Sequence, residues 1–579
     1  MAETTQSSSE VIFQPEPVKW SDIINRGLIT GVILLFVGMV GMLAAFNERE
    51  IVRDYLTLGQ LLIIVVPFIG AFISTRKTLT DTKNAGAAIA SGLLVGVLTA
   101  LMSLALLWLT NLLPDIDDIL TNVNRDWIET ITFDNRRDQP LGAGIFFGVV
   151  MASSVVGTLL YFIPEKIRKA IIWGTSFTVA IAIFGETVNL ILDQLVPDAV
   201  IDALFRRDSL LLIPAIGLFV LSNIGALIWV FVRGDGSEKP KRNDGERSPA
   251  YYIGMALFVG LLLALPWIVG RTLSDVAVTV GLFVLMGFGL NIAIGLAGLL
   301  DLGYVTNYAV GAYVLAVLTS TGLLGRGPEW LNFWMVIPIA LISAMIAGFL
   351  FAVPVLKMRG DYLAIATLGF GEIIGKLALS DWLAPIIGGA QGVLRIPKPV
   401  FFGIELTNPE QLYYIVLAAC VITLFVSVRL NNSRTGRQWM AIREDEDVAA
   451  AMGINVAQAK LLAFTLSAAT GGVAGAIFAA KVGTVFPNSF TVFISINVLS
   501  LIIVGGMGSN PGILLGAIAL VGMPELLREF TEYRWLIYGA LLIFMMVNRP
   551  EGLWPSQVRR RELNDDTQQS DGEAVVASA

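Results

Sequence analysis

The segment "GRQWMAIREDEDVAAAMGINVAQAKLLAF" (436–464) follows an apolar run at 411–429 and leads into another at 457–481. A run of about 20 apolar residues is long enough to cross a bilayer as a helix. Charged side chains in the hydrocarbon region are costly and rare. The charged residues of the segment are Arg437, Arg443, Glu444, Asp445, Glu446 and Asp447. The pattern predicts two membrane helices joined by a connector outside the bilayer.

The composition of the whole chain agrees with a membrane protein. Of 579 residues, 55% are hydrophobic and 15% are charged, whereas soluble domains have about 25% charged residues. The net charge of −7 does not favour a nucleic-acid partner. The chain has no histidine, the commonest metal ligand and general base, and its single cysteine, Cys420, cannot form an intramolecular disulfide. We therefore expect no metal site and no catalysis.

Apolar runs of the same kind recur along the chain and set the expected fold class. The fold class is predicted to be all-α, a polytopic integral membrane protein with about 16 membrane segments, some of them broken or re-entrant. The runs lie at 28–46, 57–74, 86–113, 142–163, 170–195, 209–232, 250–270, 276–298, 302–324, 332–356, 361–379, 411–429, 457–481, 489–507, 511–527 and 533–548.

The polar gaps between the runs predict the domains and the orientation. We expect a polar cytoplasmic tail at 1–27, a six-span membrane extension at 28–232, a cytoplasmic linker at 233–249, a second membrane domain at 250–555 and a disordered cytoplasmic tail at 556–579. Basic residues gather in alternate gaps, as they do in cytoplasmic loops. This places both termini and the segment 430–456 in the cytoplasm.

Residues 444–452 are predicted to form a short cytoplasmic helix. The acidic residues stand at its start, where the helix dipole favours anions, and Gly453 can end it. One interpretation is an ordinary solvated loop helix. The other is a docking helix, with small alanines that allow close approach and charges that set the register of a cytoplasmic partner. Arg437 and Trp439, just before it, are expected to anchor it at the lipid headgroups.

Asp447-Val448-Ala449, followed by Gly453, resembles the E-A-A-x-x-x-G loop of ABC-importer permeases, with Asp in place of Glu and Val in place of the first Ala. Five blocks in order resemble the membrane subunit of the branched-chain amino-acid ABC importers, the larger of two paired permeases. They are "GLNIAIGLAGLLDLGYVTNYAVGAYVLAVL" (289–318), "MRGDYLAIATLGFGEI" (358–373), "GGAQGVLRIPKP" (388–399), "TGRQWMAIREDEDVAAAMGINV" (435–456) and "VGGMGSNPGILLGA" (504–517). The resemblance covers about 250–555 and leaves 1–249 unmatched.

The resemblance implies a non-catalytic permease subunit in the bacterial inner membrane. Its partners would be two ATP-binding-cassette ATPases, a shorter homologous permease, a periplasmic or extracytoplasmic substrate-binding protein, the amino acid and membrane lipid. "GFGEIIGKL" (369–377) misses the phosphate-loop pattern, so this chain would bind no cofactor and partner subunits would use the ATP. The ATPase-docking residues would be Arg443, Glu444, Asp445, Glu446, Asp447, Ala449 and Gly453.

Polar residues near an interrupted apolar run are candidates for the substrate pathway, because broken helices expose backbone dipoles that suit an amino acid. They are Asn291, Asp301, Thr306, Asn307 and Tyr308. The alternative is that they cap helices or bond neighbouring helices. The loop 388–399 is either a surface for the delivering protein or a structural loop. Urea or short amides as cargo, or a secondary transporter, stay open as alternatives.

Overall fold

The computed structural model describes residues 17–112, 120–135, 137–206, 209–232, 249–322, 324–328, 330–526 and 533–555. Contacts divide the chain into two compact units, Met1–Arg247 and Ser248–Ala579. Helices make up nearly all of the regular structure, and the few strands are two or three residues long, which confirms the all-α class. The linker predicted at 233–249 lies almost wholly outside the described residues, as do 1–16 and the tail at 556–579.

The described residues contain ten helices that are long and apolar enough to cross a membrane, or eleven if the bent pair of helices α8 (Glu165–Ile183) and α9 (Gly185–Leu195) is one span. The expected count of about 16 is not confirmed. Three apolar runs form helices shorter than a span, at Val305–Thr319, Asn510–Leu526 and Arg534–Asn548. The runs at 250–270 and 276–298 form one long helix with a break at Gly270, where φ is 73°.

The first unit contains a bundle of α1, α3, α4 and α7. Its close packing depends on small residues, because in lipid they let helix backbones approach. A Cβ atom on Gly92 would lie 2.0 Å from Thr158 Oγ1, and one on Gly96 would lie 2.6 Å from Ser154 Oγ. The elements are α1 Trp20–Met39, α2 Met42–Asn47, β1 Glu50–Val52, β2 Leu56–Thr57, α3 Leu58–Thr82, α4 Ala85–Leu112, α6 Arg125–Ile131, α7 Gln139–Phe162, α8 Glu165–Ile183, α9 Gly185–Leu195, α10 Asp198–Leu204, β3 Phe205–Arg206, β4 Ser209–Leu210 and α11 Leu212–Val232.

A small sheet of order β2-β1-β4-β3 completes the first unit. Strand β1 pairs with β2 in antiparallel fashion and with β4 in parallel, through Val52 and Leu210. The sheet therefore joins the loop before α3 to the segment before α11, far apart in sequence.

The second unit is built around α20, which packs against α12, α13 and α14. Its elements are α12 Pro249–Asn291, the π-helix η1 Ile292–Leu296, α13 Val305–Thr319, α14 Phe333–Val355, α15 Asp361–Ala378, α16 Ala384–Ile387, η2 Gly389–Gln391, β5 Val400–Phe401, β6 Ile404–Glu405, α17 Pro409–Asn431, α18 Arg434–Glu444, α19 Glu446–Ala451, α20 Val456–Val482, η3 Pro487–Ser489, α21 Val492–Gly505, α22 Asn510–Ala517, η4 Ile518–Gly522, α23 Met523–Leu526 and α24 Arg534–Asn548.

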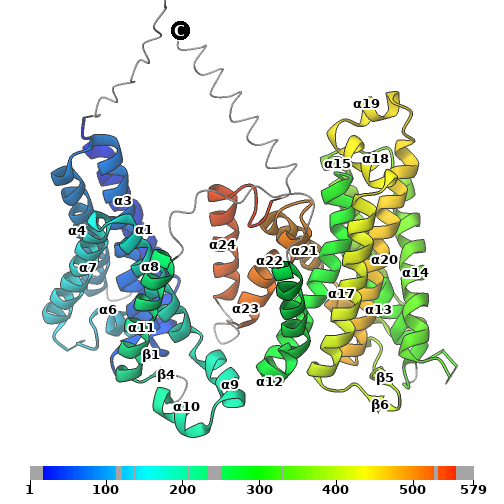
Figure 1. Cartoon of the computed structure of the whole chain (residues 1–579), viewed down its shortest axis with the longest axis horizontal. Coiled ribbons are helices and arrows are strands. Elements are labelled where there is room, and N and C mark those ends of the chain that lie inside the picture. The colour runs from blue at the N-terminus through cyan, green and yellow to red at the C-terminus, as the bar shows by residue number, and fades with distance from the viewer. Residues whose placement is uncertain are drawn as a thin grey trace, which may run out of the picture. The chain divides into compact units, whose positions relative to one another are not determined.

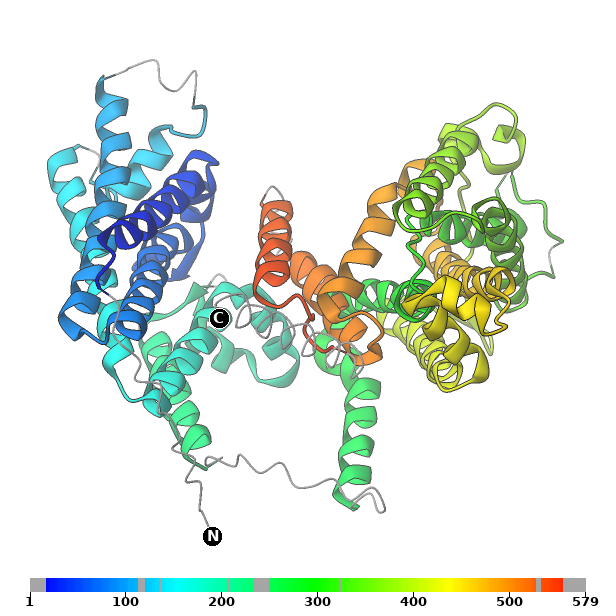
Figure 2. The same ribbon diagram turned by 90° about the horizontal axis from the view of Figure 1, so that it is seen from above.

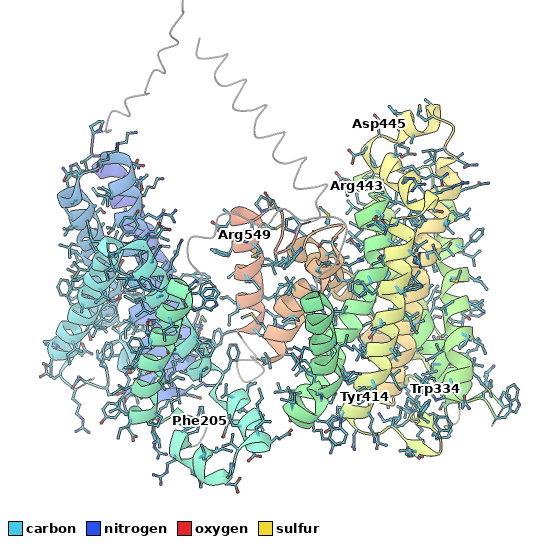
Figure 3. All side chains as sticks on the ribbon, in the orientation of Figure 1. Phe205, Trp334, Tyr414, Arg443, Asp445 and Arg549 are labelled. Carbon is cyan, nitrogen blue, oxygen red and sulfur yellow. The ribbon has the colours of Figure 1, made fainter. Side chains whose placement is uncertain are left out.

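Glycines set the close contacts of α20. A Cβ atom on Gly475 would lie 1.9 Å from the Tyr308 carbonyl oxygen, and one on Gly472 would lie 2.3 Å from Ala344 Cβ. Figure 1 shows α18 and α19 at one end of this helix group and the β5–β6 hairpin at the other. Seen from above, α18 and α19, in yellow, lie over the ends of neighbouring helices (Figure 2). The labelled side chains follow the same division, with Arg443 and Asp445 at one end and Trp334 and Tyr414 at the other (Figure 3).

Candidate functional site

The charged segment forms two helices rather than one rod at 444–452. Helix α18 ends at Glu444, and Asp445 has an extended backbone with φ −154° and ψ 116°. The Asp445 carboxylate accepts the N–H groups of Asp447 and Val448 at 2.8 and 2.9 Å, which makes it the N-cap of α19. An aspartate is a strong N-cap because it satisfies N–H groups that the first turn leaves unpaired. Helix α19 therefore begins at Glu446, two residues after the start that the sequence predicts.

Gly453 ends α19, as the sequence predicts. Its φ is +86°, a left-handed value that favours glycine. The N–H of Gly453 donates to the Ala450 carbonyl and that of Ile454 donates to the Ala449 carbonyl. These two bonds are the Schellman pattern that closes a helix end. The six-residue helix is thus capped at both ends.

Two of the acidic residues are engaged within the chain. Glu446 Oε2 accepts a hydrogen bond of 2.7 Å from Lys460 Nζ, and the Lys460 side chain is only 3% exposed. Arg359, from the loop between α14 and α15, donates to both carboxylate oxygens of Asp447 at 2.8 and 3.0 Å. The hydrogen bond from Arg359 lowers the pKa of Asp447, and the bond to Asp447 raises the pKa of Arg359. These ion pairs tie α19 to α20 and to the loop before α15.

The exposed side of α19 and its C-cap carries apolar and small residues beside the Asp447 carboxylate, whose side chain is 76% exposed. Val448 is 58% exposed and Met452 is 80% exposed, while Ala449 is buried against the unit. Glu444 and Asp445 are also exposed. Of the predicted docking residues, Glu446, Asp447 and Ala449 make internal contacts, whereas Val448 and Met452, which the sequence prediction did not include, are exposed. Both are apolar residues in a segment that the sequence places outside the bilayer, and this is a signal that could have pointed to them.

The residues just before α19 face inward. Trp439 is fully buried and its Nε1 donates to the Ala459 carbonyl at 2.8 Å. The expectation that Trp439 anchors the segment at the headgroups is therefore wrong, because the apolar face of α18 packs onto the spans instead. Arg443 Nη1 donates to the Gly295 carbonyl at 3.0 Å. This contact directs Arg443 toward the broken span rather than toward the outer surface, while Arg437 is exposed.

The predicted pathway residues are all buried, at 2–5% exposure. Asp301, Thr306 and Asn307 line one small cavity of about 20 Å³, together with Thr367. In the described part of the chain, Thr306 Oγ1 and Asn307 Oδ1 have no hydrogen-bond partner. The cavity has the size of about one water molecule, so it does not hold an amino acid in this conformation.

The other two pathway residues lie elsewhere. Asn291 Oδ1 accepts the Gly508 N–H at 2.9 Å, which joins two interrupted segments. Tyr308 lies among aromatic rings, with centroids 5.4 Å from Phe478 and 5.6 Å from Phe490. These contacts match the alternative interpretation, in which polar and aromatic residues hold neighbouring helices together.

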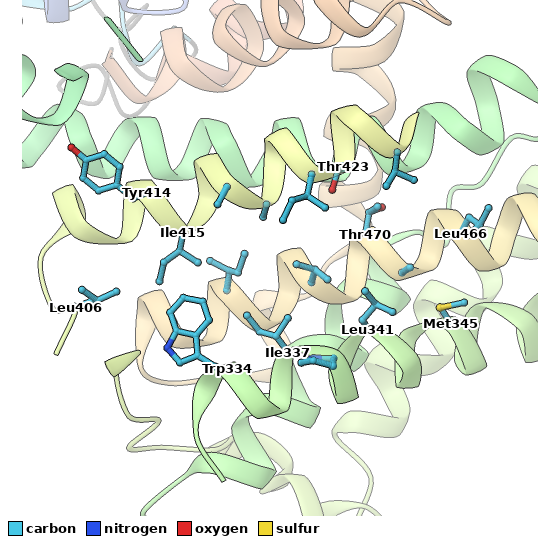
Figure 4. Close-up of a pocket in the computed structure, with 18 of the residues that line it drawn as sticks. Trp334, Ile337, Leu341, Met345, Leu406, Tyr414, Ile415, Thr423, Leu466 and Thr470 are labelled. Carbon is cyan, nitrogen blue, oxygen red and sulfur yellow. The ribbon is translucent and has the colours of Figure 1, made fainter. Parts of the chain in front are cut away.

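A larger cavity of about 890 Å³ lies between α14, α17 and α20. Figure 4 shows side chains of all three helices facing it, among them Ile337, Thr423 and Thr470. Of the predicted pathway residues none lines it, although Ile292, next to Asn291, does. Its walls carry no charged side chain, so they suit hydrocarbon rather than the ammonium and carboxylate of an amino acid. Sequence reasoning missed this groove, because neutral residues from separate spans leave no motif.

The loop 388–399 is tied to the end of α20. Val393 and Val485 exchange two backbone hydrogen bonds of 2.9 Å. Lys398 Nζ donates to the Ala480 carbonyl at 3.1 Å and also to the Lys481 carbonyl. Burial, with the nearby Lys481, lowers the pKa of Lys398. A cation at a helix C-terminus is favourable, so this loop is a defined structural element.

Comparison with known proteins adds to this geometry. The family described as branched-chain amino acid transport system / permease component matches residues 272–546, inside the second unit. The chain is 43% identical over 324 residues to the high-affinity branched-chain amino acid transport system permease protein LivM of Escherichia coli (strain K12), covering 52% of this chain and 74% of that protein.

Two further relatives show the same likeness. Identity to the permease protein LivM of Salmonella typhimurium is 41% over 342 residues, covering 55% of this chain and 78% of that protein. Identity to the high-affinity branched-chain amino acid transport system permease protein LivH of Escherichia coli (strain K12) is 25% over 289 residues, covering 47% and 90%. No solved structure matches the chain significantly.

Proposed function

The chain belongs to the family of branched-chain amino acid transport permeases, and on this premise we propose that it is a membrane-spanning permease subunit of an ATP-driven importer of branched-chain amino acids. It spans the membrane several times. Its likeness to both LivM and LivH supports pairing with a shorter homologous permease. Two ATPase subunits and a soluble substrate-binding protein complete the proposed assembly.

The observation that carries the docking part of the proposal is the architecture of α19. A six-residue helix is too short to be stable alone, yet here it is capped at both ends and held by ion pairs with Arg359 and Lys460. Its outward face presents Val448 and Met452. A rigid, apolar projection suits insertion into a groove of a partner protein. The end of the unit that carries α19 is then the cytoplasmic end, and the membrane is the bacterial inner membrane.

In the proposed mechanism, ATP binding closes the two partner ATPases and displaces α19. The spans then move between inward-facing and outward-facing states. This chain binds no nucleotide and no other cofactor, and it transmits the movement while the partners hydrolyse ATP. The loop 388–399, at the opposite end, would face the binding protein.

We propose that the broken spans form this subunit's part of the substrate pathway. Asp301, Thr306 and Asn307 place oxygen atoms beside an interrupted helix, where they could accept the ammonium group of an amino acid. Small-ligand sites measure about 300–1,000 Å³, so the cavity of about 20 Å³ has to open during transport. Urea or short amides as cargo are not favoured, because the relatives are named for branched-chain amino acids.

Site-directed cross-linking tests the docking proposal. In a background where Cys420, the only cysteine of the chain, is replaced by serine, one variant carries Met452→Cys and a control carries Phe402→Cys. Both side chains are highly exposed, at 80% and 91%, and they lie at opposite ends of the unit. We expect the first cysteine to cross-link to the ATPase subunit and the second not to. An ATPase that co-purifies yet links only to residue 402 would contradict the proposal.

Affinity purification from mild detergent tests the assembly itself. Two ATPase subunits and a shorter permease should co-purify with the full chain. Transport by the chain alone, driven by an ion gradient, would instead identify a secondary transporter.

A further inference from the structure

Arg443 lies between the docking helix and the first broken span. It belongs to the last turn of α18, directly before α19. Its Nη1 donates to the Gly295 carbonyl, 3.0 Å away, in the π-helix η1. Gly298, which follows η1, has φ +70°, and a Cβ atom there would lie 3.0 Å from Arg443 Cγ. The arginine side chain therefore lies directly against the segment where the span is interrupted.

The same segment is joined to a second interruption. Asn291 Oδ1 accepts the Gly508 N–H at 2.9 Å, and Gly508 lies in the turn between α21 and α22. A Cβ atom on Gly295 would lie 2.0 Å from Asn291 Oδ1 and 2.9 Å from the Gly508 nitrogen. Only glycine at 295 leaves room for this hydrogen bond. Arg443, η1 and the turn at Gly508 thus form a continuous series of contacts.

Apolar packing also joins α18 and α19 to η1, beside the contacts of Arg443 and Asn291. Trp439, Ile442 and Ala449 of α18 and α19 belong to the same buried cluster as Ile292 and Leu296 of η1. Protein interiors are close-packed and transmit displacement rather than absorb it. A movement of α19 would therefore reach η1 through α18, whose Arg443 contacts Gly295 directly.

A cavity beside Arg443 gives these elements room to move. Its volume is about 420 Å³, and its lining includes Gly295, Arg443, Glu444, Gly508, Ser509 and Trp554. The cavity lies between α18 and the turn at Gly508. Because side chains do not fill this space, the two segments have room to move toward each other. Energetic coupling between distant sites is carried by packed elements that take two arrangements, and this cavity leaves space for a second one.

We propose that Arg443 is a positioning residue that couples movement of the docking helix α19 to the two broken spans, through Gly295 and then the Asn291–Gly508 hydrogen bond. This rests on the proposed function, in which ATPases bind α19. The guanidinium group suits the task because its planar donors fix direction as well as distance. Loss of the link leaves ATPase docking intact and removes the transfer of movement.

The test uses the assembled transporter in proteoliposomes, with ATP hydrolysis and amino-acid uptake measured on the same preparation. Arg443→Ala should lower uptake by about tenfold or more, the range of typical coupling between sites, while ATP hydrolysis and ATPase co-purification change less than about twofold. Arg443→Lys, which keeps a donor, should recover part of the uptake. Arg437→Ala is the matched control, because it removes an exposed arginine from the same helix.

A second variant keeps the test decisive if Arg443→Ala fails to assemble. Asn291→Ala breaks the series at its other end and should give the same separation of uptake from hydrolysis. The proposal is overturned if Arg443→Ala and Asn291→Ala leave uptake unchanged, or if uptake and hydrolysis fall in equal proportion. A wild-type chain that recruits no ATPase would instead overturn the proposed function, so the two failures are distinguishable.

Discussion

Replacing Glu446 by alanine tests whether the internal ion pairs hold α19 in its docking position. Glu446 Oε2 accepts a hydrogen bond of 2.7 Å from the ammonium group of Lys460, whose side chain is 3% exposed. Removing one partner of a fully buried ion pair costs about 3–5 kcal/mol, because the other charge is left buried and unpaired. Glu446 itself is 23% exposed, so water can reach the vacated position. We expect a smaller cost of about 1–3 kcal/mol.

This free-energy cost destabilises the folded, docked position of α19, because a helix of six residues has no independent stability. A change of 1–3 kcal/mol corresponds to about 5- to 150-fold in an equilibrium constant. Glu446→Ala should therefore weaken ATPase association by an amount in that range. The measurement is a titration of the purified ATPase against the chain in lipid nanodiscs.

Two matched variants define the comparison for Glu446. Glu444→Ala removes an exposed carboxylate two residues earlier and should leave the affinity within about twofold, as exposed charges contribute little. Glu446→Gln keeps an oxygen that can accept from Lys460 and should give an intermediate loss. Equal losses for the two alanine variants, or no loss for Glu446→Ala, would refute the reasoning.

Four further predictions follow from the same structure. Trp439→Ala should destabilise the folded chain by about 3–5 kcal/mol, because the side chain is fully buried; thermal unfolding in detergent checks this, and an unchanged midpoint would contradict it. Gly453→Ala should cost about 1–2 kcal/mol at the end of α19, where φ is +86°, seen as faster amide exchange at 449–454. Lys398→Ala should cost about 0.3–1 kcal/mol at the C-terminus of α20 and should speed amide exchange at Val393 and Ile396, both bonded to 483–485. The stabilising contribution of the Arg359–Asp447 pair should not change with pH near neutrality. The pKa of the Asp447 carboxyl group is lowered, so the contribution is present above the ordinary pKa of 3.8 and is lost only as pH falls through the lowered pKa. ATPase affinity that changes between pH of about 6 and about 8 in wild type but not in Arg359→Ala would contradict this.

The helical fold was predictable because each long apolar run is a local property of the sequence. Within the described residues, each such run from 28–46 to 533–548 overlaps at least one helix, and Gly453 marks a helix end as expected. The number of spans was not predictable, since apolar content does not reveal a helix as short as Val305–Thr319. Apolar composition indicates that a segment is buried in lipid or protein, whereas the length of its helix and its packing decide whether it spans the membrane.

The position of the charged connector between two helices was predictable from the sequence, and the contacts of its residues were not. An acidic segment between two apolar runs has to lie outside the bilayer, but four consecutive acidic residues offer several possible N-caps, and only Asp445 takes that role. Glu446 pairs with Lys460 and also with Arg359, and Asp447 pairs with Arg359. Arg359 lies 88 positions from Asp447, so no local pattern links them; the only sequence signal is that both loops are assigned to the same side of the membrane.

The central claim is that this chain is a permease subunit of an ATP-driven importer of branched-chain amino acids. The most direct measurement is uptake of radiolabelled leucine into proteoliposomes that contain this chain, the shorter permease, the ATPases and the binding protein. The account predicts uptake that requires ATP, that stops when this chain is omitted, and that excess urea does not inhibit. Uptake that persists with catalytically inactive ATPases and follows an imposed ion gradient would contradict it.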